Sequence, residues 1–181
     1  CHIDGPYGTP SAHIFESRFA VLIGAGIGVT PFASVLESIV LRAQGKGGEP
    51  SRLSKAHFFW LNRDQYSFEW FSALLAHLEA EDRGGLLDIH IHMTGGRGNI
   101  TASSWNLGLD ILHAAGHRDL LTGLRAQTKM GHPDWERELE RIAARHAPEP
   151  VDVYFCGPHG LAAKLRPICG RLGMRFRQEH F

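Results

Sequence analysis

The chain alternates between short runs of apolar residues and longer stretches in which apolar residues return every three or four positions. Short runs are typical of strands buried on both faces of a parallel sheet, and the longer stretches are typical of amphipathic helices. We expect strands at residues 19–23, 56–61, 87–93, 151–156 and 174–181. We expect helices at residues 30–39, 68–78, 105–115, 134–146 and 161–172. This alternation predicts an α/β fold with a doubly wound, mostly parallel sheet, in which ligands bind at the carboxyl ends of the strands.

The composition is that of one ordinary domain, because 181 residues with 43% apolar content suffice for a hydrophobic core. Nineteen basic and nineteen acidic residues cancel, so we expect no nucleic-acid partner, no direct membrane insertion and only local anion binding. No apolar run is expected to reach the roughly 18 residues of a membrane span, so the chain itself is expected to be soluble. Three widely spaced cysteines favour a reducing, cytosolic setting over a disulfide framework.

Glycines cluster where the first expected strand passes into its helix, in the segment Gly24-Ala25-Gly26-Ile27-Gly28-Val29-Thr30-Pro31. Glycine lets the backbone approach a pyrophosphate, and a helix N-terminus offers N–H groups and a partial positive charge. Thr30 is expected to cap this helix, with Pro31 at its first position. The segment predicts a phosphate-binding cradle. Its spacing is GxGxGxxP, because Val29 stands where the dinucleotide fingerprint GxGxxG has its third glycine, and a purely structural turn is the alternative.

The end of the second expected strand, Asn62-Arg63-Asp64, bears on which nucleotide binds. A ribose 2′-hydroxyl is usually held by an acidic residue here, whereas a 2′-phosphate needs a cation. Arg63 favours NADPH because a guanidinium matches phosphate in a fork geometry, although a solvated Arg63–Asp64 pair is the alternative. Asn62 and Thr94, at the carboxyl ends of their strands, are also predicted to contact the cofactor.

Two further features lie where a flat cofactor ring could bind. Cys156-Gly157-Pro158 follows the strand at 151–156, where a small thiol could pack against a nicotinamide ring, or could simply be buried. Phe181 ends the chain, and a terminal aromatic ring can stack on a cofactor and swing away, or can fray.

We predict no metal site. His113 and His117 have helical metal-ligand spacing, but Gly116 interrupts the helix and no third ligand is evident. His90 and His92 share one strand face and are expected to line a polar surface or an interface. No GxSxG nucleophile motif is present in the sequence.

Together these motifs resemble the NADPH oxidase family, within the ferredoxin-NADP reductase superfamily, along nearly the whole chain. The segments that carry the resemblance are Asp4-Gly5-Pro6-Tyr7-Gly8-Thr9, the run from Gly24 to Ser34, Phe68-Glu69-Trp70-Phe71, Thr122-Gly123-Leu124, Cys156-Gly157-Pro158 and Phe181. Phe-Glu-Trp-Phe is the most discriminating. The start of the chain and Trp60-Leu61-Asn62-Arg63-Asp64-Gln65 look closest to the calcium-regulated branch, the fifth human type and its bacterial relatives.

The resemblance implies a cytosolic dehydrogenase region in which NADPH passes hydride to FAD, after which electrons cross a haem-bearing membrane domain to oxygen and form superoxide. By analogy, the glycine segment holds the phosphates, Arg63 holds the 2′-phosphate, Cys156 lies beside the nicotinamide and Phe181 covers the flavin. Residues 1–18 would be the tail of an FAD-binding domain and residues 19–181 the NADPH-binding domain. FAD and haem would then be held mainly outside this chain, at the cytoplasmic face of a membrane.

One departure from the family pattern concerns the cofactor. The family usually has Gly-Arg-Pro where this chain has Gly131-His132-Pro133, and histidine is only partly cationic near neutral pH. His132 therefore predicts weaker NADPH selectivity, or tighter binding below about pH 6.5. Two other functions remain open: the NADPH half of a metal-chelate or ferredoxin-type reductase, and a non-catalytic nucleotide-binding interaction module.

Overall fold

A six-stranded sheet, parallel at every described pairing, forms the centre of the molecule, in the order β4-β3-β2-β1-β5-β6. The computed structural model describes residues 10–46, 51–63, 69–95, 106–107, 109–110, 119 and 122–179. The strands are β1 (Phe19–Ala25), β2 (Lys55–Asn62), β3 (Leu87–Met93), β4 (Thr128–Met130), β5 (Val151–Cys156) and β6 (Arg175–Glu179). The predicted α/β class with a parallel sheet is confirmed.

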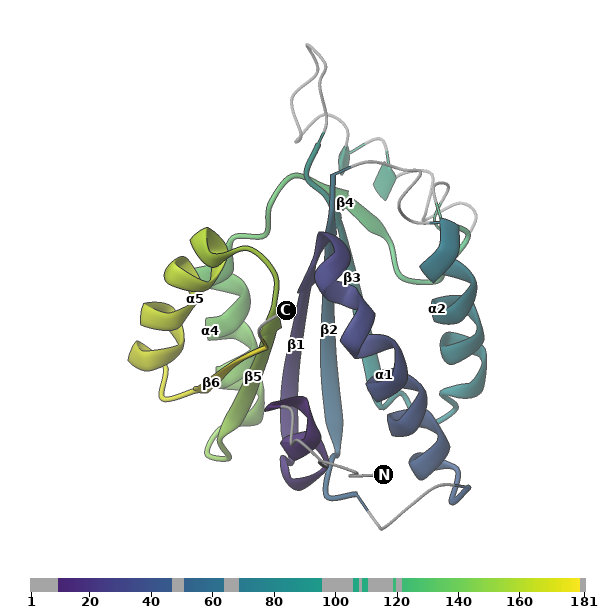
Figure 1. The fold of residues 1–181 in the computed structure, drawn as a ribbon, viewed down its shortest axis with the longest axis horizontal. Coiled ribbons are helices and arrows are strands. Elements are labelled where there is room, and N and C mark those ends of the chain that lie inside the picture. The colour runs from purple at the N-terminus through teal and green to yellow at the C-terminus, as the bar shows by residue number, and fades with distance from the viewer. Residues whose placement is uncertain are drawn as a thin grey trace, which may run out of the picture.

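Helices cover both faces of this sheet, with α1 and α2 on one side and α4 and α5 on the other (Figure 1). The α-helices are α1 (Thr30–Ala43), α2 (Glu69–Glu81), α4 (Trp135–His146) and α5 (His159–Arg171), and the 3-10 helices are η1 (Pro10–Glu16) and η2 (Gly26–Val29). Of the helix predicted at 105–115, residues 106–107 and 109–110 are helical and the remainder lies outside the described residues.

Alternate side chains of the central strands pack into two separate hydrophobic layers, one on each face of the sheet. Leu22 and Phe58 face α1 and α2, whereas Ile23 and Phe59 face α4 and α5, and all four are fully buried. Each such side chain contributes roughly 1.5–3 kcal/mol when removed from water. Burial on both faces explains why these strands are continuous apolar runs in the sequence.

The direction in which successive strands are added to the sheet reverses once. From β1 the chain moves outward through β2 and β3 to β4, and then returns to place β5 and β6 on the other side of β1. The helices that follow β1 and β5 therefore lie on opposite faces, and a crevice opens between the carboxyl ends of these two strands. This reversal positions the candidate site.

Several local predictions were wrong, for physical reasons. β4 was not predicted, because its three residues form no apolar run. Thr30 is not the cap of α1: the helix begins at Thr30 itself after Val29, and the Thr30 hydroxyl donates to the carbonyl of Ile27 at 2.8 Å. Pro31 consequently occupies the second position, where its missing N–H is still tolerated.

His90 and His92 were expected to line a polar surface or an interface, but they lie largely buried on the face of the sheet that α4 covers. His92 is 6% exposed, and its Nδ1 lies 3.2 Å from the carbonyl oxygen of Gly131. The His90 ring stacks on Phe59 with centroids 4.3 Å apart. An alternating pattern marks a solvent-facing surface only in sheets with one open face, and both faces of this sheet are covered.

No uninterrupted apolar run reaches 18 residues, as expected, but one helical stretch among the described residues is long and apolar enough to span a membrane. Gly26–Ala43 is an 18-residue helical stretch with a mean hydropathy of 1.3. It comprises η2 and α1, and its residues Phe32, Leu36 and Ile39 are buried against the sheet. Its apolar character is therefore that of a core helix in this fold.

Candidate functional site

A cavity of about 970 Å³ opens at the carboxyl ends of the strands, above the reversal between β1 and β5. Cavities that hold small-molecule ligands usually measure about 300–1,000 Å³, so this one has room for a large ligand. Its lining comes from the ends of β1, β2, β3, β5 and β6 and from the starts of α4 and α5.

Most of the predicted cofactor residues line this cavity. They are Ala25, Gly26, Ile27, Gly28, Asn62, Arg63, Thr94, His132, Cys156, Gly157 and Pro158. Gly24, Val29, Thr30 and Pro31 do not line it. Gly24 and Val29 are buried beneath the turn. Asp64 and Phe181 lie outside the described residues.

The glycine turn is shaped by two of its glycines. Gly26 has a φ of +60°, a left-handed conformation that favours glycine, and no atom lies within 4 Å of where a Cβ would stand. A Cβ on Gly28 would lie 2.4 Å from the carbonyl oxygen of Cys156. The missing side chain at Gly28 thus lets the turn after β1 pack directly against the end of β5.

The N-terminus of α5 lies at the cavity, which His159 and Gly160 line, whereas Thr30 and Pro31 at the start of α1 do not line it. α5 follows β5 and has no side-chain hydrogen bond at its cap. By contrast, α4 is capped by Asp134, which accepts from the N–H of Arg137 at 3.3 Å. An N-terminus without a side-chain acceptor retains donors and partial positive charge for an anion.

The α5 side of the cavity was missed from the sequence. His159, Gly160 and Lys164 line it, and Lys164 adds a second long cation opposite Arg63. These residues sit on an ordinary amphipathic helix, and only the strand order brings them beside the glycine turn. The remaining lining residues that were not predicted are Leu61, Pro133, Trp135, Leu161, Gln178 and Glu179.

The backbone of Arg63 is held firmly, while its side chain is exposed at the cavity. The Arg63 N–H donates to Asn62 Oδ1 at 2.8 Å. The Asn62 carbonyl accepts from the N–H and hydroxyl of Thr94, at 2.7 and 3.0 Å. A Cβ on Gly95 would lie 1.8 Å from the Arg63 carbonyl oxygen, so β2 and β3 end in close backbone contact. The exposed guanidinium of Arg63 thus contributes a cation to this wall of the cavity.

Cys156 is a small neutral group at the base of the cavity. The residue is 2% exposed, and burial together with the nearby Glu179 carboxylate raises the pKa of its thiol to about 11. The thiol therefore stays protonated at neutral pH and is not an activated nucleophile. A wall atom of this kind suits van der Waals contact with a ligand.

His132 reaches the cavity from the segment after β4. The Gly131 N–H donates to the Met93 carbonyl at 2.8 Å, which fixes this segment to the end of β3. His132 is exposed and lines the cavity, followed by the buried Pro133. The structure thus brings His132 and Arg63 to the same cavity although 69 positions separate them (132 − 63).

Two of the family-like motifs serve the scaffold. Phe71 is fully buried and packs edge-on against Trp60, with ring centroids 5.0 Å apart, while Phe68 lies outside the described residues. Thr122 and Leu124 belong to a turn organised by the buried carboxylate of Asp119. Among the described residues of these motifs, Phe71, Thr122 and Leu124 do not line the cavity.

The sequence that builds this cavity is similar to those of known oxidoreductases. Residues 18–170 match the family described as Ferric reductase NAD binding domain. NADPH oxidase 5 of Homo sapiens is 43% identical over an alignment that covers 100% of this chain and 26% of that protein. NADPH oxidase 1 of Mus musculus is 40% identical, covering 93% of this chain and 28% of that protein. NADPH oxidase 3 of Homo sapiens is 38% identical, with 92% and 29% covered.

Among solved structures, ferredoxin-NADP+ reductase from Plasmodium falciparum aligns with a TM-score of 0.54 and 12% sequence identity. The alignment covers 98% of this chain and 59% of that one, and at this identity it shows a shared fold alone. The relatives confirm the resemblance that the motifs predicted. The chain spans between a quarter and a third of the length of the curated relatives named above.

Proposed function

The chain belongs to the family of ferric reductase NAD-binding domains, and from this premise we propose that it is the NADPH-binding part of a flavin-dependent NADPH oxidase. In this proposal the chain positions NADPH for hydride transfer to a flavin held elsewhere in a longer parent protein. The observation that carries the proposal is the convergence of the glycine turn, the N-terminus of α5, Arg63 and Lys164 on one cavity at the reversal of the sheet. A doubly charged pyrophosphate and a third phosphate match this distribution of positive charge.

Each part of NADPH can be assigned to a group of residues that line the cavity. The pyrophosphate would bind between the glycine turn at Gly26 and Gly28 and the start of α5, where Lys164 lies. The 2′-phosphate would bind Arg63, with His132 beside it. The nicotinamide would pack against Cys156, whose neutral thiol adds neither charge nor bulk. The bound cofactor supplies a hydride from its C4 atom, and the work of this chain is to hold and orient that ring.

The activity of the whole protein follows from the relatives as a proposal. FAD would be held by a neighbouring domain and covered by Phe181, and electrons would pass by haem in a membrane domain to oxygen, giving superoxide. The chain would then lie at the cytoplasmic face of a membrane. Accordingly, we expect the isolated chain to bind NADPH without retaining stoichiometric flavin. A purified sample with the yellow colour of equimolar flavin would contradict this arrangement.

Replacing Arg63 tests the assignment of the nucleotide. Arg63→Ala removes a charged partner of the 2′-phosphate, so NADPH affinity should fall by roughly tenfold or more while NADH affinity stays within about twofold. The measurement is calorimetric titration of the 181-residue chain with each nucleotide. Arg83→Ala is the matched control, because Arg83 is exposed and lies outside the cavity lining. Equal loss for both nucleotides would remove Arg63 from the 2′-phosphate site.

The description of the matched family favours one second candidate, a reductase of ferric chelates that uses the same NADPH half. Fusing the chain to its flavin domain and following NADPH consumption with either oxygen or a ferric chelate separates the two. Faster turnover with the chelate would favour the reductase. An absence of NADPH binding at millimolar concentration would favour a non-catalytic interaction module.

A further inference from the structure

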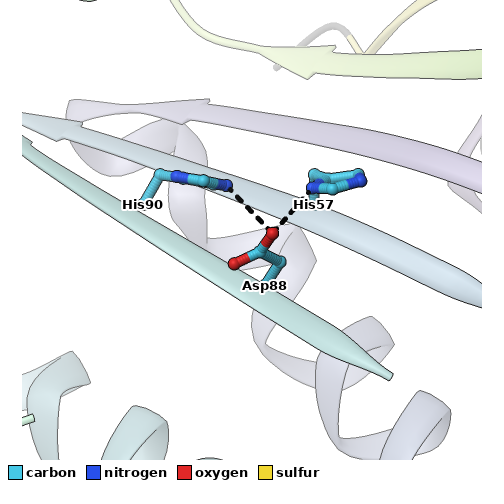
Figure 2. A group of neighbouring side chains, drawn as sticks. All are labelled: His57, Asp88 and His90. Carbon is cyan, nitrogen blue, oxygen red and sulfur yellow. Dashed lines mark ion pairs between the residues drawn. The ribbon is translucent and has the colours of Figure 1, made fainter. Parts of the chain in front are cut away.

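A second group of polar side chains lies on the same sheet, near the amino ends of its strands. His57 comes from β2, and Asp88 and His90 come from β3, two positions apart and therefore on one face. His57 and Asp88 are register partners in the parallel pair. Figure 2 shows the Asp88 carboxylate between the two imidazole rings. Asp88 precedes Thr94 by six residues, which is roughly 20 Å along a strand, so this group is separate from the cavity.

The distances within this group are those of a ligand set. His57 Nδ1 lies 3.2 Å from Asp88 Oδ2, His90 Nε2 lies 3.7 Å from the same oxygen, and the three atoms all fall within 4.8 Å of one another. A tetrahedral zinc ion with bonds of about 2.0–2.1 Å separates its ligand atoms by about 3.3 Å. The longest separation would shorten by at most about 1.5 Å on binding, which rotation of the partly exposed Asp88 and His90 side chains can supply.

Two buried nitrogen atoms in the group lack hydrogen bonds. The His57 side chain is 0% exposed, yet neither its Nδ1 nor His90 Nε2 has a hydrogen-bond partner among the described residues. The 3.2 Å approach to Asp88 is close enough for a hydrogen bond, but the two groups are not aligned for one. Buried polar atoms without partners are costly and uncommon, so this pair of nitrogens calls for a ligand.

The opposite edge of the His57 ring explains why Nδ1 can be a ligand atom. His57 Nε2 lies 3.0 Å from Nε2 of His146, whose ring stacks on Phe19 at 4.0 Å. When His57 donates its Nε2 hydrogen to His146, its Nδ1 carries a lone pair that faces a carboxylate oxygen. Two electron-rich atoms then face each other, and a cation between them relieves the repulsion. Hydrogen bonding at the distal nitrogen also orients metal-bound histidines in general.

We propose that His57, Asp88 and His90 form a binding site for a divalent transition-metal ion of the zinc class. Two imidazole nitrogens and one carboxylate are the donor set that such ions prefer, and a water molecule would complete the tetrahedron. The Asp88 side chain is 34% exposed, which gives ions and water a path to the site. Arg145 lies 3.8 Å from Asp88 and is 51% exposed, so it can move aside as the metal takes over its charge-balancing role.

The group joins two neighbouring strands, since His57 belongs to β2 and Asp88 and His90 belong to β3. A bound ion would tie β2 to β3 at the end of the sheet opposite the nucleotide cavity.

Zinc titration of the chelator-treated 181-residue chain tests the proposal. We expect one equivalent of Zn²⁺ to bind, with affinity at least about tenfold weaker in Asp88→Asn and in His90→Gln. Substituted Co²⁺ should give visible absorption bands in the wild-type chain that disappear in both variants. His77→Gln is the control, because His77 is an exposed histidine on α2 outside the group, and it should leave Zn²⁺ affinity unchanged.

Circular dichroism and urea unfolding establish whether each variant is folded. Asp88 and His90 are both partly exposed, so if one variant misfolds, the other still tests the site. Affinities equal to wild type in the folded Asp88 and His90 variants would overturn the site. An equal loss in His77→Gln would place the binding elsewhere and overturn it too. The NADPH affinity of the same samples should equal that of the wild-type chain, so a failure of the metal proposal can be distinguished from a failure of the nucleotide-binding proposal.

Discussion

At the scale of single residues, Arg63 and His132 are the two side chains that we propose to contact the 2′-phosphate of NADPH. Both are exposed, and both line the cavity from segments that are anchored by backbone hydrogen bonds. Their chemistry differs, because a guanidinium is a permanent planar cation and an imidazole is only partly charged near neutral pH. The present cavity therefore carries one permanent cation, Arg63, on this side.

Replacing His132 with arginine should add a second permanent cation. We expect His132→Arg to raise the ratio of NADPH to NADH affinity by roughly three- to tenfold, a modest gain because the site is exposed to solvent. The ratio is measured by titrating both nucleotides at pH 7.5. His77→Arg, which adds the same charge on α2 away from the cavity lining, is the control. An unchanged ratio would exclude His132 from recognition of the phosphate.

A different prediction concerns Cys156, because its proposed packing against the nicotinamide requires that its thiol remain protonated. Its pKa, like that of buried Cys169, is raised to about 11 chiefly by burial. The thiolate fraction at pH 7.5 is then roughly a hundredfold lower than for an ordinary thiol, since two pKa units separate them. In a Cys1→Ser background, iodoacetamide should label the folded chain at least that much more slowly than the chain in urea, as followed by mass spectrometry. Equal rates would mean that Cys156 is reactive and unsuited to the proposed packing role.

At the scale of elements, β4 shows how a strand can form from residues with little intrinsic preference for β structure. Asp119 is 3% exposed, and its carboxylate accepts from the N–H and hydroxyl groups of both Thr122 and Thr128, at 2.7–2.9 Å. This carboxylate fixes the turn before β4 and the first residue of the strand. The segment with His132 follows β4 directly, so Asp119 indirectly positions one wall of the cavity.

Removing this carboxylate should be costly. Asp119→Ala leaves buried donors at Thr128 unpaired, and we expect a loss of about 2–4 kcal/mol in the free energy of unfolding. Urea unfolding followed by circular dichroism measures it. Asp110→Ala is the control, because Asp110 is exposed and its carboxylate accepts from the Gln127 side chain at 2.8 Å at the surface, so its loss should matter by less than about 0.5 kcal/mol. A small effect at Asp119 would show that β4 is held by its pairing with β3 instead.

The same contrast explains what the sequence could predict. β1, β2 and β5 are found directly, because burial on both faces demands continuous apolar runs. β4 is missed, because its stability comes from a distant carboxylate and from an edge pairing with no local signal. Lys164 is missed for a similar reason: nothing on an amphipathic helix marks the residue that the strand order will place beside a glycine turn. The surroundings of His90 and His92 were predicted wrongly, because the alternation of polar and apolar residues along β3 cannot reveal that α4 covers the face on which the histidines lie.

At the scale of the whole molecule, the two ends of the parallel sheet carry two different groups of polar residues. The carboxyl ends of the strands carry the cavity and its positive groups, whereas the amino ends of β2 and β3 carry the histidine and aspartate group. Both arise from one sheet, because parallel strands bring equivalent ends together. Ligands at the two ends would therefore bind independently, apart from any effect through stability of the sheet.

The boundary of the folded unit is the remaining question at this scale, and the predicted division at residue 18 is still a prediction. Residues before β1 pack closely on the domain: Ile14 is fully buried in the α1 and α2 layer, and the Ser17 hydroxyl donates to Asp152 at 2.5 Å. A chain starting at Phe19 should lose about 3 kcal/mol or more in the free energy of unfolding, because it opens a cavity and weakens a buried hydrogen-bond network. A chain starting at Pro10 keeps both contacts and serves as the control. Equal urea midpoints for the two chains would place η1 outside the folded unit, as an appendage of whatever precedes it.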